Sequence, residues 1–113
     1  MKAVMVAFTN RTSGTSNEAF NAWYDEIHIP EVLGVPGFVA ATRYRGSSVD
    51  PGLGSRAHEY LCVYEIEADD LATAKKGLAA AAPTWQPTDV LDLESRSILF
   101  YEQITETVGA SPA

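Results

Sequence analysis

The sequence predicts an α+β fold in which two helices cover one face of a four-stranded antiparallel sheet, and three observations support this. The 113 residues suffice for one compact domain and are too few for two. A composition of 46% hydrophobic and 20% charged residues is typical of globular proteins. Periodicity gives the order strand, helix, strand, strand, helix, strand. We expect one domain over residues 1–106 and a flexible C-terminal tail over residues 107–113.

The first strand and the first helix are predicted from the N-terminal third of the chain. Residues Lys2–Thr9 alternate between two sets of apolar side chains, as in a strand that is buried on both faces. Thr15 followed by Glu18 forms a capping box, which starts a helix that runs to about Ile29. Pro30 is expected to end or kink this helix. One helical stripe collects the residues Phe20, Trp23, Tyr24, Ile27 and His28.

Three further strands and a second helix are predicted in the remainder. The turn Pro36-Gly37 precedes a strand over Phe38–Arg45, with Phe38, Ala40, Thr42 and Tyr44 on one face. Asp69 is expected to cap the second helix, and Pro83 to close it. The other predicted segments are a loop over Gly46–Ser55, a strand over His58–Glu67 and a strand over Arg96–Ile104.

This order, βαββαβ, is that of the ferredoxin-like fold. Two helices cover only one face of such a sheet, yet the second face is also rich in apolar residues. Since most soluble oligomers are symmetric, we expect a homodimer in which two sheets pack face to face, with a cavity left between sheet and helices.

Charge and cysteine content exclude several classes of function. The formal net charge is −7 and the pI is near 4.6, so we expect no nucleic-acid and no membrane partner. One cysteine and two histidines give neither a disulfide nor a metal site. No phosphate-binding glycine loop or dinucleotide fingerprint is present, so we expect no cofactor. The N-terminus lacks the pattern of a signal peptide, which favours a cytoplasmic protein.

One segment resembles a known group of proteins. In WYDEIHIPEVLGVPGFVAATRYR, residues 23–45, a Trp-Tyr pair precedes a histidine and a proline, and Pro-Gly-Phe opens a strand that ends in Arg-Tyr-Arg. This pattern resembles the EthD-like group of the dimeric α/β-barrel superfamily. The resemblance implies a barrel-like dimer with one ligand pocket per subunit, between the first helix and the sheet. It does not imply one activity, because the superfamily hosts monooxygenases, cyclases, isomerases and haem-degrading enzymes.

His28 is the main catalytic candidate. It lies one turn after Tyr24 in the last turn before Pro30, where the helix dipole and a carboxylate three residues away, Asp25 or Glu31, favour its cation. An imidazole in an apolar pocket suits proton transfer near neutral pH. Tyr24 would polarise a substrate carbonyl, and Asp25 would orient the imidazole. The alternative is a histidine that merely fastens the end of the helix.

The substrate-binding candidates are mainly aromatic side chains on strand faces, which would suit a planar or phenolic ligand. A dimer interface would also explain them, because tyrosine is enriched there. Cys62 is interpreted as a small buried hydrophobe, and His58 as either a pocket residue or a surface residue at a strand entry. The candidates are Trp23, Tyr44, Tyr60, Cys62, Tyr64, His58 and Phe100.

These observations favour a cofactor-independent enzyme that acts on a small hydrophobic or aromatic carbonyl compound by acid/base proton transfer, as an isomerase, cyclase or lyase does. One alternative is a non-catalytic protein that binds a small molecule and assists a catabolic or biosynthetic pathway. Another is a cofactor-free monooxygenase. Haem binding through His28 is a further possibility that an absorption spectrum would test.

Overall fold

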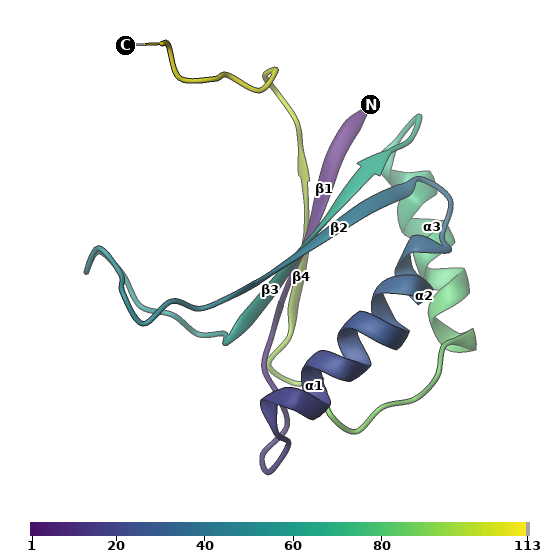
Figure 1. The fold of residues 1–113 in the computed structure, drawn as a ribbon. Helices are drawn as coiled ribbons and strands as arrows, with labels where there is room; N and C mark the ends of the chain where they lie inside the picture. Colours follow the sequence, from purple (N-terminus) through teal and green to yellow (C-terminus); the bar gives the residue numbers. More distant parts are fainter. Residues whose placement is uncertain (113) are drawn as a thin grey trace.

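The structure, a computed structural model, describes residues 1–112; residue 113 of the predicted tail lies outside them. The strands and helical segments follow the predicted order, with the first predicted helix divided into α1 and α2 (Figure 1). A π-helical turn, η1, joins the first two helices, and a 3₁₀ turn, η2, follows the third. In chain order the elements are β1 (Lys2–Thr9), α1 (Asn17–Trp23), η1 (Tyr24–His28), α2 (Ile29–Leu33), β2 (Phe38–Arg45), β3 (Tyr60–Glu67), α3 (Leu71–Ala81), η2 (Ala82–Thr84) and β4 (Ser97–Glu102).

The four strands form one antiparallel sheet in the order β2-β3-β1-β4. The helical segments all lie on one face of it (Figure 1). This arrangement confirms the predicted α+β, ferredoxin-like fold.

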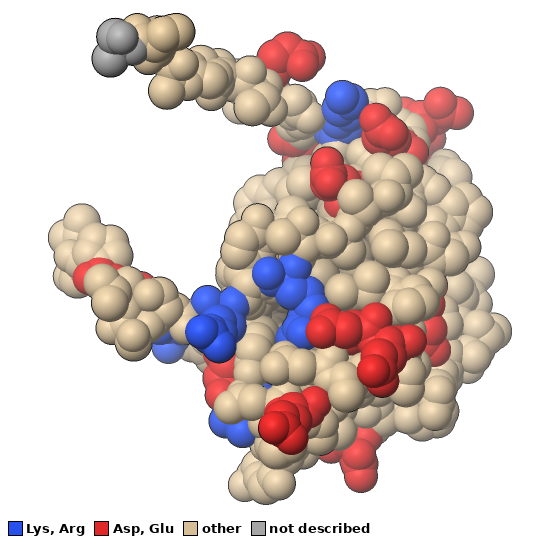
Figure 2. Space-filling view, viewed as in Figure 1, with Lys and Arg blue, Asp and Glu red and all other residues tan. Residues whose placement is uncertain are grey.

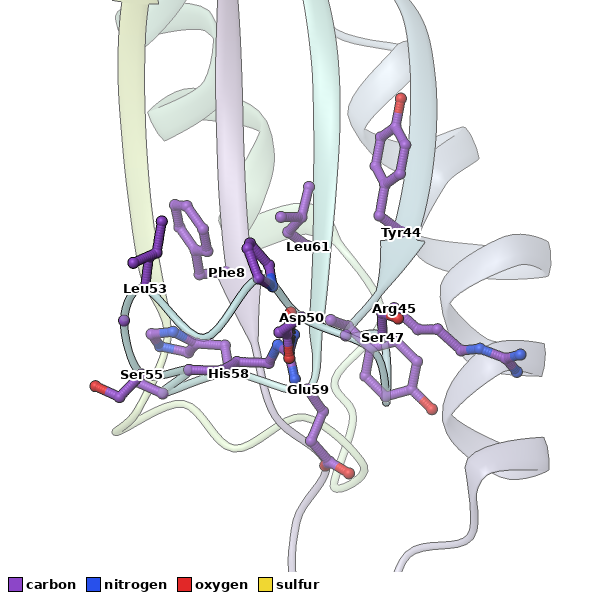
Figure 3. A pocket seen from close by; sticks show the side chains of 16 residues that line it. Phe8, Tyr44, Arg45, Ser47, Asp50, Leu53, Ser55, His58, Glu59 and Leu61 are labelled. Atoms are coloured by element: carbon purple, nitrogen blue, oxygen red, sulfur yellow. Dashed lines mark hydrogen bonds and ion pairs between the residues drawn. The ribbon is translucent and has the colours of Figure 1, made fainter.

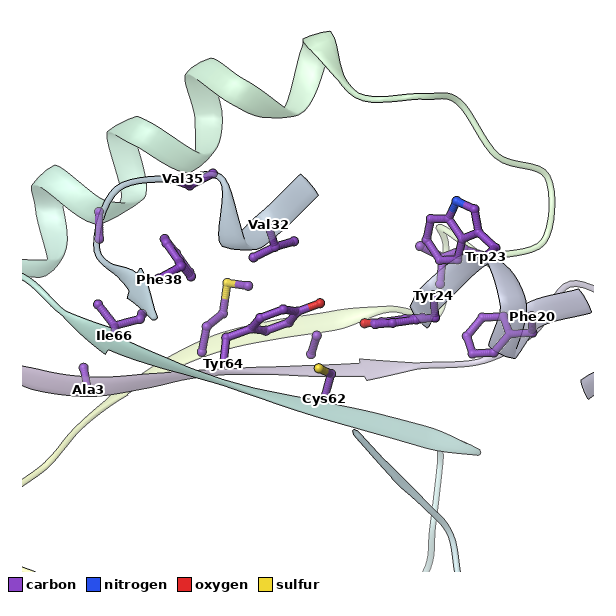
Figure 4. Packing of buried hydrophobic residues seen from close by; sticks show 14 residues of the cluster. Ala3, Phe20, Trp23, Tyr24, Val32, Val35, Phe38, Cys62, Tyr64 and Ile66 are labelled. Atoms are coloured by element: carbon purple, nitrogen blue, oxygen red, sulfur yellow. The ribbon is translucent and has the colours of Figure 1, made fainter. Parts of the chain in front are cut away.

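The hydrophobic core lies between this face and the helices. β1 contributes Ala3, Met5 and Ala7, each at most 4% exposed. This apolar set of β1 is more deeply buried than the other set. The remaining core residues come mainly from α1, η1, α2 and β3: Phe20, Trp23, Tyr24, Val32, Val35, Phe38, Cys62, Tyr64 and Ile66 (Figure 4).

The first helical segment does not end at Pro30, contrary to the expectation from sequence. Proline lacks an N–H and its ring crowds the carbonyl four residues earlier. Here the chain widens into the π-helical turn η1, in which the Ile29 N–H bonds the Tyr24 carbonyl. Pro30 then occupies the first turn of α2, where its missing donor costs little. The segment therefore continues to Leu33, and π-helical turns of this kind are frequent at functional sites.

The predicted face of β2 is also corrected. A β-bulge lies between Phe38 and Ala40, so that the alternation changes phase after Phe38. Phe38 points into the core, but from there on it is Ala41, paired with Tyr64, and Arg43, paired with Cys62, that share the helix-covered face. Ala40, Thr42 and Tyr44 consequently lie on the opposite face.

Element ends differ from the sequence expectation by one to three residues. The N-cap of α1 is Ser16 and not Thr15, since the Ser16 hydroxyl accepts the Ala19 N–H at 3.1 Å. The cap of α3 is Asp70 and not Asp69, because the Asp70 carboxylate accepts the Thr73 N–H at 2.7 Å. β3 begins at Tyr60 and β4 ends at Glu102.

The face of the sheet opposite the helices is open and carries two projecting arms. One arm is the β2–β3 connection, residues 46–57, and the other is the C-terminal segment, residues 103–112 (Figures 1 and 2). Among their exposed apolar residues are Leu53, 91% exposed, and Ile104, 92% exposed. Within residues 1–112 no helix has the length and apolar character needed to cross a bilayer.

Candidate functional site

A cavity of about 700 Å³ lies between the helices and the covered face of the sheet. Its floor comes from β1 and β3, one wall from η1 and α2, another from α3, and its mouth from the segment between α3 and β4. This volume lies within the usual range of small-molecule sites. Four predicted site residues line this cavity together: Trp23, Tyr24, His28 and Tyr64.

The His28 imidazole is enclosed by aromatic rings. It stacks on Trp23 with ring centroids 4.7 Å apart and planes 18° apart. The edges of Tyr24 and Trp85 approach it with centroid distances of 5.1 and 5.6 Å. The π-helical turn brings Tyr24 and His28 onto the same side as Trp23, so that η1 positions the imidazole at the cavity wall.

The carboxylate that faces His28 is that of Glu31 and not that of Asp25. Glu31 Oε1 lies 3.7 Å from His28 Nδ1, and its other oxygen accepts the Gln86 N–H at 2.8 Å. Both side chains are less than 20% exposed. Asp25, in contrast, is 59% exposed and binds Arg43 at 2.9 Å. Glu31 therefore occupies the position beside the imidazole that the sequence led us to expect for Asp25.

Burial decides the charge of His28. Desolvation lowers the pKa of His28 below its ordinary value of 6.5, while the Glu31 carboxylate raises that pKa only in part and Arg96 lowers it further. The sequence favoured the cation because of the helix end and the carboxylate. The structure corrects this, because the helical segment continues to Leu33 and burial among aromatic rings outweighs the carboxylate. His28 is thus neutral at pH 7, the form that accepts a proton.

Two buried phenols line the same cavity as the imidazole. Tyr24 is 1% and Tyr64 0% exposed, and their hydroxyl groups point toward each other (Figure 4). Burial raises the pKa of Tyr24 to about 12 and raises the pKa of Tyr64 as well. Both phenols therefore remain protonated at neutral pH and can donate hydrogen bonds.

Four buried polar atoms of this cavity have no hydrogen-bond partner within residues 1–112. They are Thr9 Oγ1, Trp23 Nε1, Glu31 Oε1 and Tyr64 Oη. Leaving a buried polar group unpaired costs about 1–3 kcal/mol, so most such groups in folded proteins are paired. Their gathering around one cavity indicates that a ligand or ordered water completes them.

Arg43 holds the outer side of Tyr24. Its guanidinium lies 4.5 Å from the centre of the Tyr24 ring and donates to Asp25 Oδ1 at 2.9 Å and Asn21 Oδ1 at 3.0 Å. This arrangement ties α1 and η1 to β2. Arg43 and Asp25 consequently attach the first helical segment to the sheet and do not contact the imidazole.

The other predicted site residues lie elsewhere. Cys62, 1% exposed, is part of the core, and burial raises the pKa of its thiol, while Phe100 packs against the same core. Tyr44, Tyr60 and His58 line a second hollow of about 590 Å³ beneath the β2–β3 arm (Figure 3). Tyr60 also stacks on Phe20 and donates its hydroxyl to Asn17, and the His58 ring nitrogen Nε2 lies 2.7 Å from the Ser95 carbonyl oxygen.

Sequence reasoning missed several residues of the cavity. Trp85 lies in the irregular segment after Pro83, where no periodicity marks its direction. Thr9 ends β1 and is 2% exposed, so that strand alternation with Ala7 was its one available signal. Arg96 precedes β4 and carries no motif. In the described part of the chain, no group of three or more potential metal ligands gathers anywhere.

The structure is thus that of a ferredoxin-like protein with a cavity between its helices and its sheet. The solved structures similar to it support the fold. HapK from Hahella chejuensis has a TM-score of 0.61 at 15% identity, over 98% of this chain and 100% of HapK. An EthD family protein from Bacillus halodurans has a TM-score of 0.59 at 16% identity, over 92% and 100% of the two chains.

A third structure with this fold is that of the haem degrader MhuD from Mycobacterium tuberculosis with two haems in its active site. Its TM-score is 0.59 at 19% identity, over 94% of this chain and 99% of MhuD. No protein-family model and no curated protein matches the sequence. The chain thus shares the fold of EthD family structures, at identities that show the fold alone.

Proposed function

We propose that this protein is a cofactor-independent enzyme that moves a proton on a hydrophobic or aromatic carbonyl compound, in an isomerase, cyclase or lyase reaction. The observation that carries the proposal is the neutral His28 beside Glu31 in an aromatic cavity whose buried polar atoms lack partners. Such a pair, a base with a carboxylate that orients it, is a common acid/base arrangement.

The geometry gives each residue a role. Nδ1 of His28 faces Glu31, which leaves Nε2 as the nitrogen that takes a proton from the carbon next to the substrate carbonyl. The electron pair of that C–H bond moves onto the carbonyl oxygen, and the resulting enolate accepts a hydrogen bond from Tyr64. Glu31 stabilises the imidazolium, and return of the proton to another atom completes the reaction. The Tyr24 hydroxyl faces the Tyr64 hydroxyl (Figure 4).

We further propose that the protein is a homodimer. Tyr44, Leu99 and Tyr101 on the open face of the sheet are 53%, 45% and 54% exposed. Both arms extend from this face and add exposed apolar side chains around it (Figure 2). A second copy of the open face would cover this surface with matching shape, as in symmetric dimers.

Haem is the ligand that the comparison with MhuD raises. The histidine that could ligate iron here is His28, and its ring is packed against Trp23, Tyr24 and Trp85. We therefore assign no haem-dependent step to this chain. Addition of haemin tests this directly, because a Soret band that His28→Gln abolishes would contradict it.

The experiment that tests the proposed function is a ligand-detected screen of the purified protein against phenolic, quinone and lactone metabolites, followed by His28→Gln on each compound that binds. We expect wild type to convert a compound that the variant only binds. If compounds bind but are never converted, or if both proteins convert them equally, the enzyme proposal would be wrong and a binding protein would be the better interpretation. Oxygen consumption during turnover would instead indicate the cofactor-free monooxygenase.

A further inference from the structure

The mouth of the His28 cavity carries positive charge on an acidic protein. Lys75 of the α3 wall and Arg96, just before β4, both line the cavity, although the chain has only eight Lys and Arg against 15 Asp and Glu. Arg96 is close enough to His28 to lower the pKa of the imidazole. The carboxylate among the lining residues is Glu31, which faces His28 and the Gln86 N–H.

These two cations are available to a ligand. Within residues 1–112, neither Lys75 nor Arg96 forms an ion pair or a side-chain hydrogen bond, whereas Arg11, Arg43 and Arg56 are each bound to a carboxylate. Both side chains are exposed at the rim. Two cations on different elements that border one cavity favour an anionic group there.

The interior of the cavity has a different character. Its deeper surface is mainly apolar and aromatic, and one of its unpartnered buried atoms is Trp23 Nε1, which can only donate. The indole nitrogen points away from the sheet (Figure 4). A ligand that satisfies the site therefore brings an apolar body and a hydrogen-bond acceptor such as a carbonyl oxygen.

We propose that the ligand is an oxo acid: an apolar or aromatic body and its carbonyl inside the cavity, and a carboxylate at the mouth between Lys75 and Arg96. This inference rests on the proposed function for the location of the site, and it adds the charge of the substrate. It predicts that the protein binds oxo acids more tightly than neutral ketones of the same shape.

The test compares acids with their neutral amides by titration calorimetry. The probes are 4-oxo-4-phenylbutanoate and a short series of aromatic and alicyclic oxo acids, each paired with its primary amide. We expect each acid that binds to do so about tenfold more tightly than its amide, and this advantage to shrink as KCl is added. Equal affinities within the pairs, or binding of no acid in the series, would overturn the proposal.

Substitutions locate the charge preference. Lys75→Gln with Arg96→Gln should weaken acid binding about fivefold to tenfold and leave amide binding unchanged. Both residues are exposed, so the fold should tolerate the change. Lys76→Gln is the matched control, because Lys76 is the next residue of α3 and does not line the cavity. An equal loss of acid binding in this control would overturn the assignment.

One readout separates this inference from the proposed function. Exchange of the proton next to the carbonyl for deuterium in D₂O reports proton transfer and not binding. Selective acid binding without exchange would support the oxo-acid site and contradict the enzyme, whereas exchange of amides as fast as acids would support the enzyme and contradict the oxo-acid site.

Discussion

The His28 imidazole pairs a buried, aromatic environment with one adjacent carboxylate. Its environment favours the neutral ring, and Glu31 opposes this only in part. Because the folded protein therefore binds a proton more weakly than the unfolded chain, the unfolded chain holds more protons below pH 6.5. His28 thus contributes stability above this pH that is lost as the pH falls toward the lower folded pKa.

This leads to a prediction for unfolding. The free energy of unfolding of wild type should fall as the pH is lowered from about 7.5 to about 5, and His28→Gln should reduce the slope. Urea denaturation at a series of pH values measures both. Identical slopes in the two proteins would show that His28 is not buried in its neutral form.

Tyr64 carries a buried hydroxyl group that the proposed function assigns to the substrate. Its hydroxyl is buried without a hydrogen-bond partner in the described residues. Tyr64→Phe should therefore leave the free energy of unfolding unchanged or raise it by about 1 kcal/mol, while lowering turnover at least tenfold. Urea denaturation and the rate assay measure these together. A clear loss of stability would mean that the hydroxyl is satisfied within the fold.

Among individual residues, the sequence predicted the site residues that lie on one helical stripe. Trp23, Tyr24 and His28 follow helical spacing, and the structure places all three at the cavity. The orienting role was expected for Asp25, whereas the carboxylate that faces His28 is that of Glu31. Both lie three residues from His28, and only the packing of β2 and of the segment around Gln86 separates them. The position of Trp85 at the cavity could not be predicted, because its segment has no periodicity.

At the level of elements, the helical segment before β2 is where local rules and tertiary packing disagreed. The rule for proline predicts an end at Pro30, but the π-helical turn accommodates the ring and lets the segment continue to Leu33. The bulge in β2, between Phe38 and Ala40, likewise interrupts the alternation that the sequence predicts. The presence of the strands and helices could be predicted from periodicity. The π-helical turn and the bulge in β2 could not, because periodicity does not mark them.

Arg43 connects the first helical segment to the sheet and supports a prediction. Arg43→Met removes two side-chain hydrogen bonds and the contact with the Tyr24 ring, so we expect a loss of about 1–2 kcal/mol in the free energy of unfolding. Arg43→Lys should recover only part of it, because lysine lacks the planar fork. Urea denaturation is the measurement.

Arg45→Met provides the control for this pair. Arg45 follows on the same face of β2 but is exposed and makes no side-chain hydrogen bond within residues 1–112. Its substitution should change the free energy of unfolding by less than about 0.5 kcal/mol. Equal losses at both positions would contradict the special role given to Arg43.

For the whole molecule, the proposed homodimer places the open face of the sheet at the interface between the two copies. Leu99 lies on this face opposite Val6 of β1 and is 45% exposed. Leu99→Lys should raise the dimer dissociation constant at least tenfold, because a symmetric interface would bury the charge twice. Sedimentation velocity across a dilution series measures it. Ala80→Lys on the exposed side of α3 is the control, and a wild type that stays monomeric would contradict the dimer.

The same scale shows how much of the architecture the sequence contains. Element order and two apolar faces were enough to predict the sheet and a cavity between it and the helices. They did not show which face the helices cover, because both faces are apolar. The direction and reach of the two arms were not predictable, because the residues of the β2–β3 connection and of the C-terminal segment carry no periodic pattern.

The central claim is that ligands bind against His28 in the cavity between helices and sheet. The chain has two tryptophans, and both line this cavity. The most direct measurement is therefore the NMR signals of the two indole N–H groups during titration with a compound from the screen. The account predicts that both signals move, that of Trp23 most, because its Nε1 gains a partner. A compound that binds while both indole signals stay fixed, and that shifts Tyr44 and Leu53 instead, would contradict it.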